Sequence, residues 1–174
     1  MTSEEQYEQY MTLHRDFSQA YSKVYKHVMD FYPLPQKFIK DAAPEIDSYV
    51  EKFSAIEKAP DQRDSFEDFF YFAKNFKEFA ANANGVFEEY KGLHGESGNY
   101  IKTIFKLKER HRSSHDEPEE YVRLIPVLNK LIGGFKDVKQ KTDEAAKNLQ
   151  QLQSEFVSLK EKMNVAKKSN AWPL

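Results

Sequence analysis

Apolar residues recur along this chain at alternating steps of three and four positions, the spacing that places side chains on one face of an α-helix. The longest series lies near the C-terminal end. It consists of Tyr121, Leu124, Leu128, Leu131, Phe135, Val138, Thr142, Ala145, Leu149, Leu152, Phe156, Leu159, Met163 and Ala166. An alternation kept over so many positions predicts a long helix that buries one continuous stripe.

Further series of the same kind occupy the rest of the chain. The first two are Tyr7, Tyr10, His14, Phe17, Tyr21, Val24, Val28 and Phe31, and then Ile39, Ala42, Ile46, Tyr49, Phe53 and Ile56. A shorter helical piece is marked by Ile101, Ile104, Phe105 and Leu107. Because no segment alternates apolar and polar residues as a half-buried strand does, the predicted fold class is all-α.

The stretch from Ser65 to Tyr90 holds half of the chain's 14 phenylalanines. Its main stripe consists of Phe66, Phe69, Ala73, Phe76, Ala80, Ala83, Phe87 and Tyr90, and a neighbouring column adds Phe72, Phe79 and Val86. A stripe of this width contacts two neighbouring helices, and alternation of alanine with phenylalanine is typical of interdigitated side chains. We therefore expect packed core here rather than a membrane wedge or the walls of a ligand cavity.

Proline, glycine and charged residues divide the chain into three helical segments of similar length. The segments are about 3–58, 65–113 and 118–168, followed by a short tail at 169–174. We expect turns between them, with Ser65 capping the second segment and Asp116 with Pro118 starting the third. Equal segments joined by short turns favour a single domain over residues 1–174, an elongated antiparallel helical bundle.

Each segment also contains a weak point at which a helix is expected to bend or break. These points are Tyr32–Pro35, Gly92–Gly98, and Pro126 with Gly133 and Gly134. Proline removes a backbone donor and collides with the preceding turn, and glycine loosens a helix. With these interruptions, the three kinked segments amount to about five helices.

The C-terminal stripe becomes narrower after Lys139, where its flanking columns are rich in lysine, glutamine and glutamate. A narrow apolar stripe with polar flanks is typical of a coiled-coil seam. The candidate interaction residues of this seam are Leu149, Leu152, Phe156, Leu159 and Met163. Its partner is a second chain, as in a homodimer or a complex with another protein, or else the chain's own first helix.

Composition limits the classes of function. With 174 residues, 26 basic and 28 acidic side chains and a formal net charge of −2, the chain has no global field that attracts nucleic acid or anionic lipid. The absence of cysteine excludes disulfides and thiolate chemistry and suits a reducing compartment. The polar N-terminus lacks the features of a secretory signal, so we expect the mature chain to start here. No apolar run approaches the roughly 20 residues of a membrane span, and we expect a soluble, cytoplasmic protein.

No pattern of residues indicates catalysis, a cofactor site or a metal site, and we expect a protein that is not an enzyme. None of the five histidines follows a glutamate at the three-residue spacing of helical two-metal sites. His111 and His115, followed by two acidic residues, form only a weak zinc pattern. His14 lies on an apolar stripe and is expected to be a hydrogen-bonded core histidine.

The stretch 101–112 is the most basic part of the chain and is a candidate surface for anionic partners. Its cations are Lys102, Lys106, Lys108, Arg110 and Arg112, against Glu109 alone. Cations near an anionic membrane each contribute about 1 kcal/mol, although a solvated helix face is the favoured interpretation. Nucleic acid is not an expected partner, because no recognition helix or stacking platform accompanies the patch.

These patterns favour a non-enzymatic structural or protein–protein interaction module, a scaffold that acts through helical-bundle and coiled-coil surfaces. The alternative is a peripheral membrane module. Three long, kinked, antiparallel segments resemble the plan of a BAR domain, whose dimers bind curved membrane through cationic side chains. The resemblance is one of layout, covers no sequence motif, and implies membrane binding through the basic stretch. A soluble helical toxin is a third interpretation, for which no apolar insertion hairpin is visible.

Overall fold

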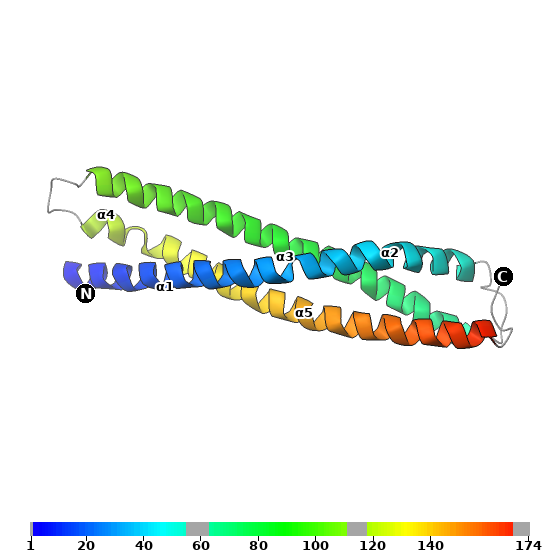
Figure 1. Ribbon diagram of the computed structural model, residues 1–174. Helices are drawn as coiled ribbons and strands as arrows, with labels where there is room; N and C mark the ends of the chain where they lie inside the picture. The colour runs from blue at the N-terminus through cyan, green and yellow to red at the C-terminus, as the bar shows by residue number, and fades with distance from the viewer. Residues whose placement is uncertain (1, 55–62, 111–117, 169–174) are drawn as a thin grey trace. The chain divides into compact units, whose positions relative to one another are not determined.

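The computed structural model describes residues 2–54, 63–110 and 118–168, which form five α-helices (Figure 1). The helices are α1 (Ser3–Phe31), α2 (Pro33–Ser54), α3 (Arg63–Arg110), α4 (Pro118–Val122) and α5 (Ile125–Lys168). No strand occurs in these three stretches. The prediction of an all-α helical bundle with about five helices is therefore confirmed.

The chain divides into two compact units, and both α3 and α5 contribute to each of them. The first unit contains Met1–Asp30 and Val86–Thr142, and the second contains Phe31–Gly85 and Asp143–Leu174. Neither unit is a continuous stretch of chain, because each takes its helices from distant parts of the sequence. The single domain expected over residues 1–174 remains a prediction. Unfolding of the whole chain in one cooperative transition would test it.

In the first unit, α3 runs antiparallel to α1. Phe17 of α1 packs against Tyr100 of α3, with ring centroids 5.0 Å apart. One turn further along α1, Tyr21 contacts His94, which precedes Tyr100 on α3. The core of this unit includes buried residues of α5, namely Leu128, Leu131, Phe135 and Val138. The stripes of the N-terminal and C-terminal segments therefore meet in this core.

The second unit is built around the phenylalanine-rich part of α3. Phe53 of α2 packs edge-on against Phe69, with ring centroids 5.2 Å apart. Phe72 stacks on Phe156 of α5 with a centroid distance of 5.5 Å. The buried residues of this part of α3 are Phe69, Phe72, Ala73, Phe76 and Phe79. The prediction that these rings form packed core is confirmed, and the side chain of Phe66 lies outside the described ones.

Two prolines account for the positions at which helices are interrupted. The ring of a proline collides with the carbonyl group four residues earlier and cannot donate a hydrogen bond to it. Four residues before Pro35 is Phe31, the last residue of α1, and four residues before Pro126 is Val122, the last residue of α4. The expected interruptions at these two weak points are therefore confirmed. Pro44 lies inside α2 without ending it.

At the two glycine-based weak points, where a bend or a break was expected, the structure has no break. Gly92–Gly98 lies inside α3, and Gly133 with Gly134 lies inside α5, so neither group breaks a helix. Each glycine costs a helix only about 1 kcal/mol relative to alanine, and packing of the surrounding stripes outweighs that cost. A Cβ at Gly134 would lie 2.5 Å from Leu93 Cδ2 of α3. This glycine therefore permits a close approach of α5 to α3.

Helix starts were predicted with mixed success. Helix α3 begins at Arg63, so Ser65 lies inside the helix and is not its cap, which corrects the prediction. Helix α4 begins at Pro118, where proline's missing N–H is tolerated. Asp116, the expected cap, lies outside the described residues.

Candidate functional site

A groove of about 350 Å³ lies between α1 and α3 in the first unit. Phe17 and Tyr21 of α1 and Ile104 of α3 are among its lining residues. Two serines of α1, Ser18 and Ser22, also line it, and their four-residue separation puts them on one helix face. Small side chains on consecutive turns leave space beside the aromatic ones, which explains why the groove forms here.

Phe105 forms one edge of this groove and is 64% exposed. The preceding residue, Ile104, is buried, and the 100° turn per residue of a helix directs Phe105 away from that buried face. On α1, Met11 and Tyr25 are 45% and 47% exposed. Each is seven residues from Ser18, so all three share a face of α1. Exposed apolar side chains gathered beside a groove mark a candidate interaction site.

The groove is not evident from the spacing of apolar residues. Ile101, Ile104 and Phe105 all belong to the short helical piece expected near residue 104, and that spacing does not show which of them faces the core. One signal was available, because Ile104 and Phe105 are adjacent in sequence and adjacent helical residues cannot share a face. The serine side of the groove becomes visible only when α1 and α3 are placed together.

Three lysines of the basic stretch surround Phe105. Lys102 and Lys108 lie three residues before and after Phe105, on the same face of α3, and Lys106 follows it directly. All three lysines are exposed. Within residues 2–54, 63–110 and 118–168, no carboxylate lies at ion-pair distance from any of them. Their positive charge is therefore available to a partner.

The two arginines of the same stretch have different positions. Arg110 contacts Glu120, with 3.4 Å between Arg110 Nη1 and Glu120 Oε2. Arg110 also lies in the last turn of α3, where the helix dipole favours a cation. Arg112 lies outside the described residues. The candidate patch is therefore reduced to the three lysines that surround Phe105.

The wall of the groove includes a histidine that is bonded to two tyrosines in series. His14 Nδ1 lies 2.7 Å from the Tyr100 hydroxyl, which lies 3.3 Å from the Tyr10 hydroxyl. Burial raises the pKa of both tyrosines, so Tyr100 can donate to His14 when Nδ1 carries no hydrogen. Burial lowers the pKa of His14, and the charge of Lys108 lowers it further. The expected hydrogen bond of His14 is confirmed, but the side chain is half-buried in the groove wall rather than enclosed in the core.

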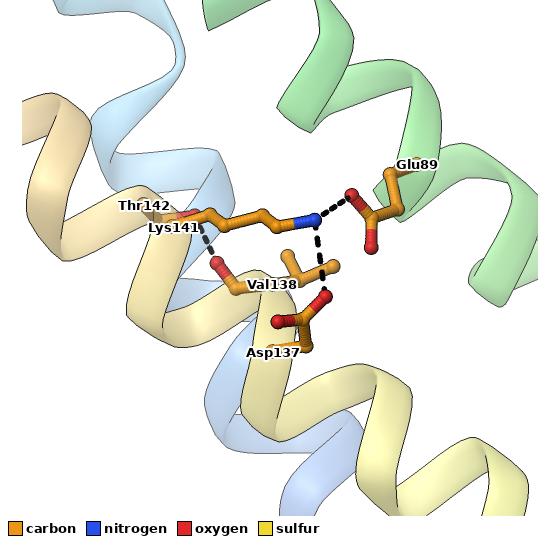
Figure 2. Close-up of polar contacts among 5 residues, drawn as sticks. All are labelled: Glu89, Asp137, Val138, Lys141 and Thr142. Carbon is orange, nitrogen blue, oxygen red and sulfur yellow. Dashed lines mark hydrogen bonds and ion pairs between the residues drawn. The ribbon is translucent and has the colours of Figure 1, made fainter. Parts of the chain in front are cut away.

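A second polar cluster joins α5 to α3 in the same unit. The Lys141 ammonium group lies 2.9 Å from Glu89 Oε2 and 3.1 Å from Asp137 Oδ2, and both contacts are drawn in Figure 2. The hydrogen bond to Glu89, followed by that to Asp137, raises the pKa of Lys141, and the bond from Lys141 lowers the pKa of Asp137. Buried Thr142 donates to the Val138 carbonyl oxygen at 2.7 Å. Because the charges are solvent-exposed, the cluster fastens two helices and offers no buried reactive group.

The candidate C-terminal seam lies in the core of the second unit. Its residues, Leu149, Leu152, Phe156, Leu159 and Met163, are 4–9% exposed in the single chain. Phe156 stacks on Phe72 of α3 and meets Phe38 of α2 edge-on. Lys160 covers the Phe156 ring and pairs with Glu45 of α2 at 2.6 Å. A second chain would have to displace α2 and α3 to reach this stripe.

The second unit carries two further grooves. One, of about 220 Å³, is lined mainly by polar side chains that include Asn75, Asn82, Asn148 and Gln151. The other, of about 440 Å³, includes Leu34, which is 56% exposed, together with Lys37 and Asp41. The first groove lacks an exposed aromatic residue. In the second groove, the positive charge of Lys37 is balanced by the negative charge of Asp41. Neither groove combines exposed aromatic surface with charge of one sign.

The described part of the chain contains neither a cluster of metal ligands nor a membrane-spanning helix. Within residues 2–54, 63–110 and 118–168, no group of three or more histidine, cysteine, aspartate or glutamate side chains could hold a metal ion. His111 and His115 lie outside these residues. No described helix is both long enough and apolar enough to cross a bilayer.

Comparison of the chain with known protein families, curated proteins and solved structures finds no match. Function must therefore be inferred from the chain's own residues. Among the described surfaces, the α1–α3 groove is the strongest candidate, because it joins an exposed phenylalanine, an apolar lining and unpaired lysines.

Proposed function

We propose that the protein is a non-enzymatic interaction module of the cytoplasm that binds a protein partner in the α1–α3 groove. The observation that carries this proposal is Phe105, which is 64% exposed at the edge of a 350 Å³ groove. Burying a phenylalanine side chain is worth about 2 kcal/mol. Because Phe105 is exposed in the free chain, a partner that covers it gains this burial free energy on binding. The cysteine-free composition supports the cytoplasmic location.

The extent of the surface favours a protein partner over a small molecule. Met11 and Tyr25, the exposed apolar residues of α1, are fourteen positions apart, or about 21 Å at the rise of an α-helix. Phe105 stands across the groove on α3. Apolar anchors spread over such a distance suit a segment of a polypeptide.

A peripheral membrane role is the second candidate, and a specific observation favours it. Lys102, Lys106 and Lys108 surround an exposed phenylalanine, and aromatic residues combined with cations attach proteins to anionic lipid. The groove itself favours the protein partner, because a bilayer surface would cover Phe105 but would not fill the space above Ser18 and Ser22.

Filling the groove tests the proposal. Ser18→Trp introduces a large ring from an exposed groove position, and Lys74→Gln, at an exposed position of α3 in the second unit, is the control. Wild-type and variant proteins, checked for equal helicity, are immobilised and incubated with cell extract, and the retained proteins are quantified by mass spectrometry. We expect a protein that the wild type and Lys74→Gln retain and Ser18→Trp loses. Equal retention by all three contradicts the proposal.

A further inference from the structure

We infer that the partner presents an acidic amphipathic helix to the α1–α3 groove, an inference that rests on the proposed function of this groove. The first argument is charge. The stretches that border the groove, residues 11–26 of α1 and 99–110 of α3, contain six lysines and arginines besides Arg110, which pairs with Glu120, but only two carboxylates, Asp16 and Glu109. The whole chain has a net charge of −2, so positive charge is concentrated at this surface. A complementary partner is acidic.

Helix dipoles do not account for this concentration. Lys108 and Arg110 lie in the last turn of α3, where cations are favoured for that reason. Lys102 lies two turns earlier, and Arg15 lies in the middle of α1. No carboxylate in the described stretches lies at ion-pair distance from Lys102 or Arg15. These cations are free to pair with acidic side chains of a partner.

The second argument is the form of the groove. Ser18 and Ser22 provide small side chains on consecutive turns of α1, and helices approach most closely where such residues lie. The exposed residues Met11 and Tyr25 mark a length of about four helical turns. No strand edge exists in the described residues to which an extended peptide could add. A helix that lies along the groove therefore fits better than an added strand.

These two arguments specify the docking helix. Its apolar residues, spaced three and four apart, contact Phe105, Tyr25 and Met11, as in other helix-in-groove complexes. Its aspartate and glutamate residues flank that apolar face and reach Lys102 and Arg15 on opposite sides of the groove. Such pairs at the rim contribute mainly to specificity and to the rate of association.

Selection from a peptide library tests the inference directly. A displayed library of helix-forming peptides about 14 residues long is selected on the immobilised full-length protein, and the affinities of enriched peptides are measured by fluorescence anisotropy. We expect enriched peptides to carry acidic residues beside apolar residues at three- and four-residue steps. Phe105→Ala should weaken their binding about thirtyfold or more, as expected for an aromatic anchor.

Charge is tested with a matched pair of double variants. Lys102→Gln with Lys108→Gln should weaken peptide binding about three- to tenfold and reduce its salt dependence, since two rim ion pairs are lost. Lys74→Gln with Lys77→Gln removes the same charge from exposed positions of α3 in the second unit and should have no effect. Far-UV circular dichroism of each variant establishes that the helices are intact.

The other outcomes separate the inference from the proposed function. Enriched peptides without an acidic excess that still lose binding in Ser18→Trp would overturn the acidic helix and leave the groove as the site. Failure to obtain any peptide that depends on Phe105 and on an open groove would overturn both. In the same series, vesicles of phosphatidylcholine with phosphatidylserine are tested by pelleting. Lysine-dependent pelleting without peptide binding would replace the helix partner by an anionic membrane.

Discussion

Two adjacent glycines of α5 provide a sharp test of the packing between α3 and α5. A Cβ at Gly133 would meet no atom within 4 Å, whereas a Cβ at Gly134 would lie 2.5 Å from Leu93 Cδ2 and 3.1 Å from Leu93 Cδ1. Gly133→Ala and Gly134→Ala therefore make the same chemical change in neighbouring helical positions. They differ in whether the added methyl group has space.

The magnitudes follow from two opposing effects. Replacing glycine by alanine in a helix interior stabilises by about 1 kcal/mol, and Gly133→Ala should gain most of this. At Gly134 the same gain is opposed by the displacement of Leu93, which is partly buried and packs against the core of the first unit. Overpacking typically costs about 1–3 kcal/mol, with the low end expected because the flexible side chain of Leu93 can change its rotamer. Gly134→Ala should therefore be less stable than Gly133→Ala by about 1 kcal/mol or more.

Urea unfolding followed by far-UV circular dichroism measures both variants against the wild type. Adding Leu93→Ala to each variant serves as the control, because it removes the contact and should bring the two alanine substitutions to similar effects. Equal stabilisation by Gly133→Ala and Gly134→Ala in the presence of Leu93 would refute the close approach of α5 to α3 at this position.

Three further predictions concern pH, cooperativity and surface charge. Burial lowers the pKa of His14 below its ordinary value of 6.5, so the unfolded chain binds the proton first as the pH falls. As the pH drops below 6.5, the unfolding free energy of the wild type should therefore decrease more steeply than that of His14→Gln, by at most about 1.4 kcal/mol per pH unit. Urea unfolding of both proteins at a series of pH values measures this, and an equal pH dependence of their unfolding free energies would contradict the prediction. Phe53→Ala and Phe135→Ala should each lower the unfolding free energy by about 3–5 kcal/mol. If the chain is a single domain, each substitution shifts one common unfolding transition. Two separate transitions, of which each substitution shifts only one, would indicate two domains. Lys141→Met should lower the melting temperature slightly, with a difference that shrinks at high salt because exposed ion pairs are screened; a difference unaffected by salt contradicts this account of the contact with Glu89.

Most of the helical architecture could be predicted from spacing, because burial of one face dominates the choice of structure. Every residue of the C-terminal stripe from Leu128 to Met163 is buried. At Pro35 and Pro126 proline was a reliable signal of a helix end, since its effect on the carbonyl four residues earlier is steric and local, whereas Pro44 lies inside α2 without ending it. Glycine was an unreliable one, since its cost of about 1 kcal/mol is readily outweighed by packing.

The candidate site was only partly predictable. The lysines around Phe105 are visible in the sequence as a charged stretch, but their relation to a groove is not. That relation depends on which face of α1 lies beside α3, and on the small side chains of Ser18 and Ser22 lining the same groove as Phe105. The C-terminal seam shows the converse case, because a stripe suited to a coiled coil is satisfied by α2 and α3 of the same chain.

The sharing of α3 and α5 between the two units has a consequence for synthesis of the protein. The first core needs residues as late as Val138, and the second needs residues as late as Met163. While the ribosome is still producing the earlier helices, the apolar stripes of α1, α2 and α3 have no third helix to cover them. Neither core can therefore close before α5 has been synthesised, and a nascent chain interrupted before α5 would expose aromatic surface to chaperones and proteases.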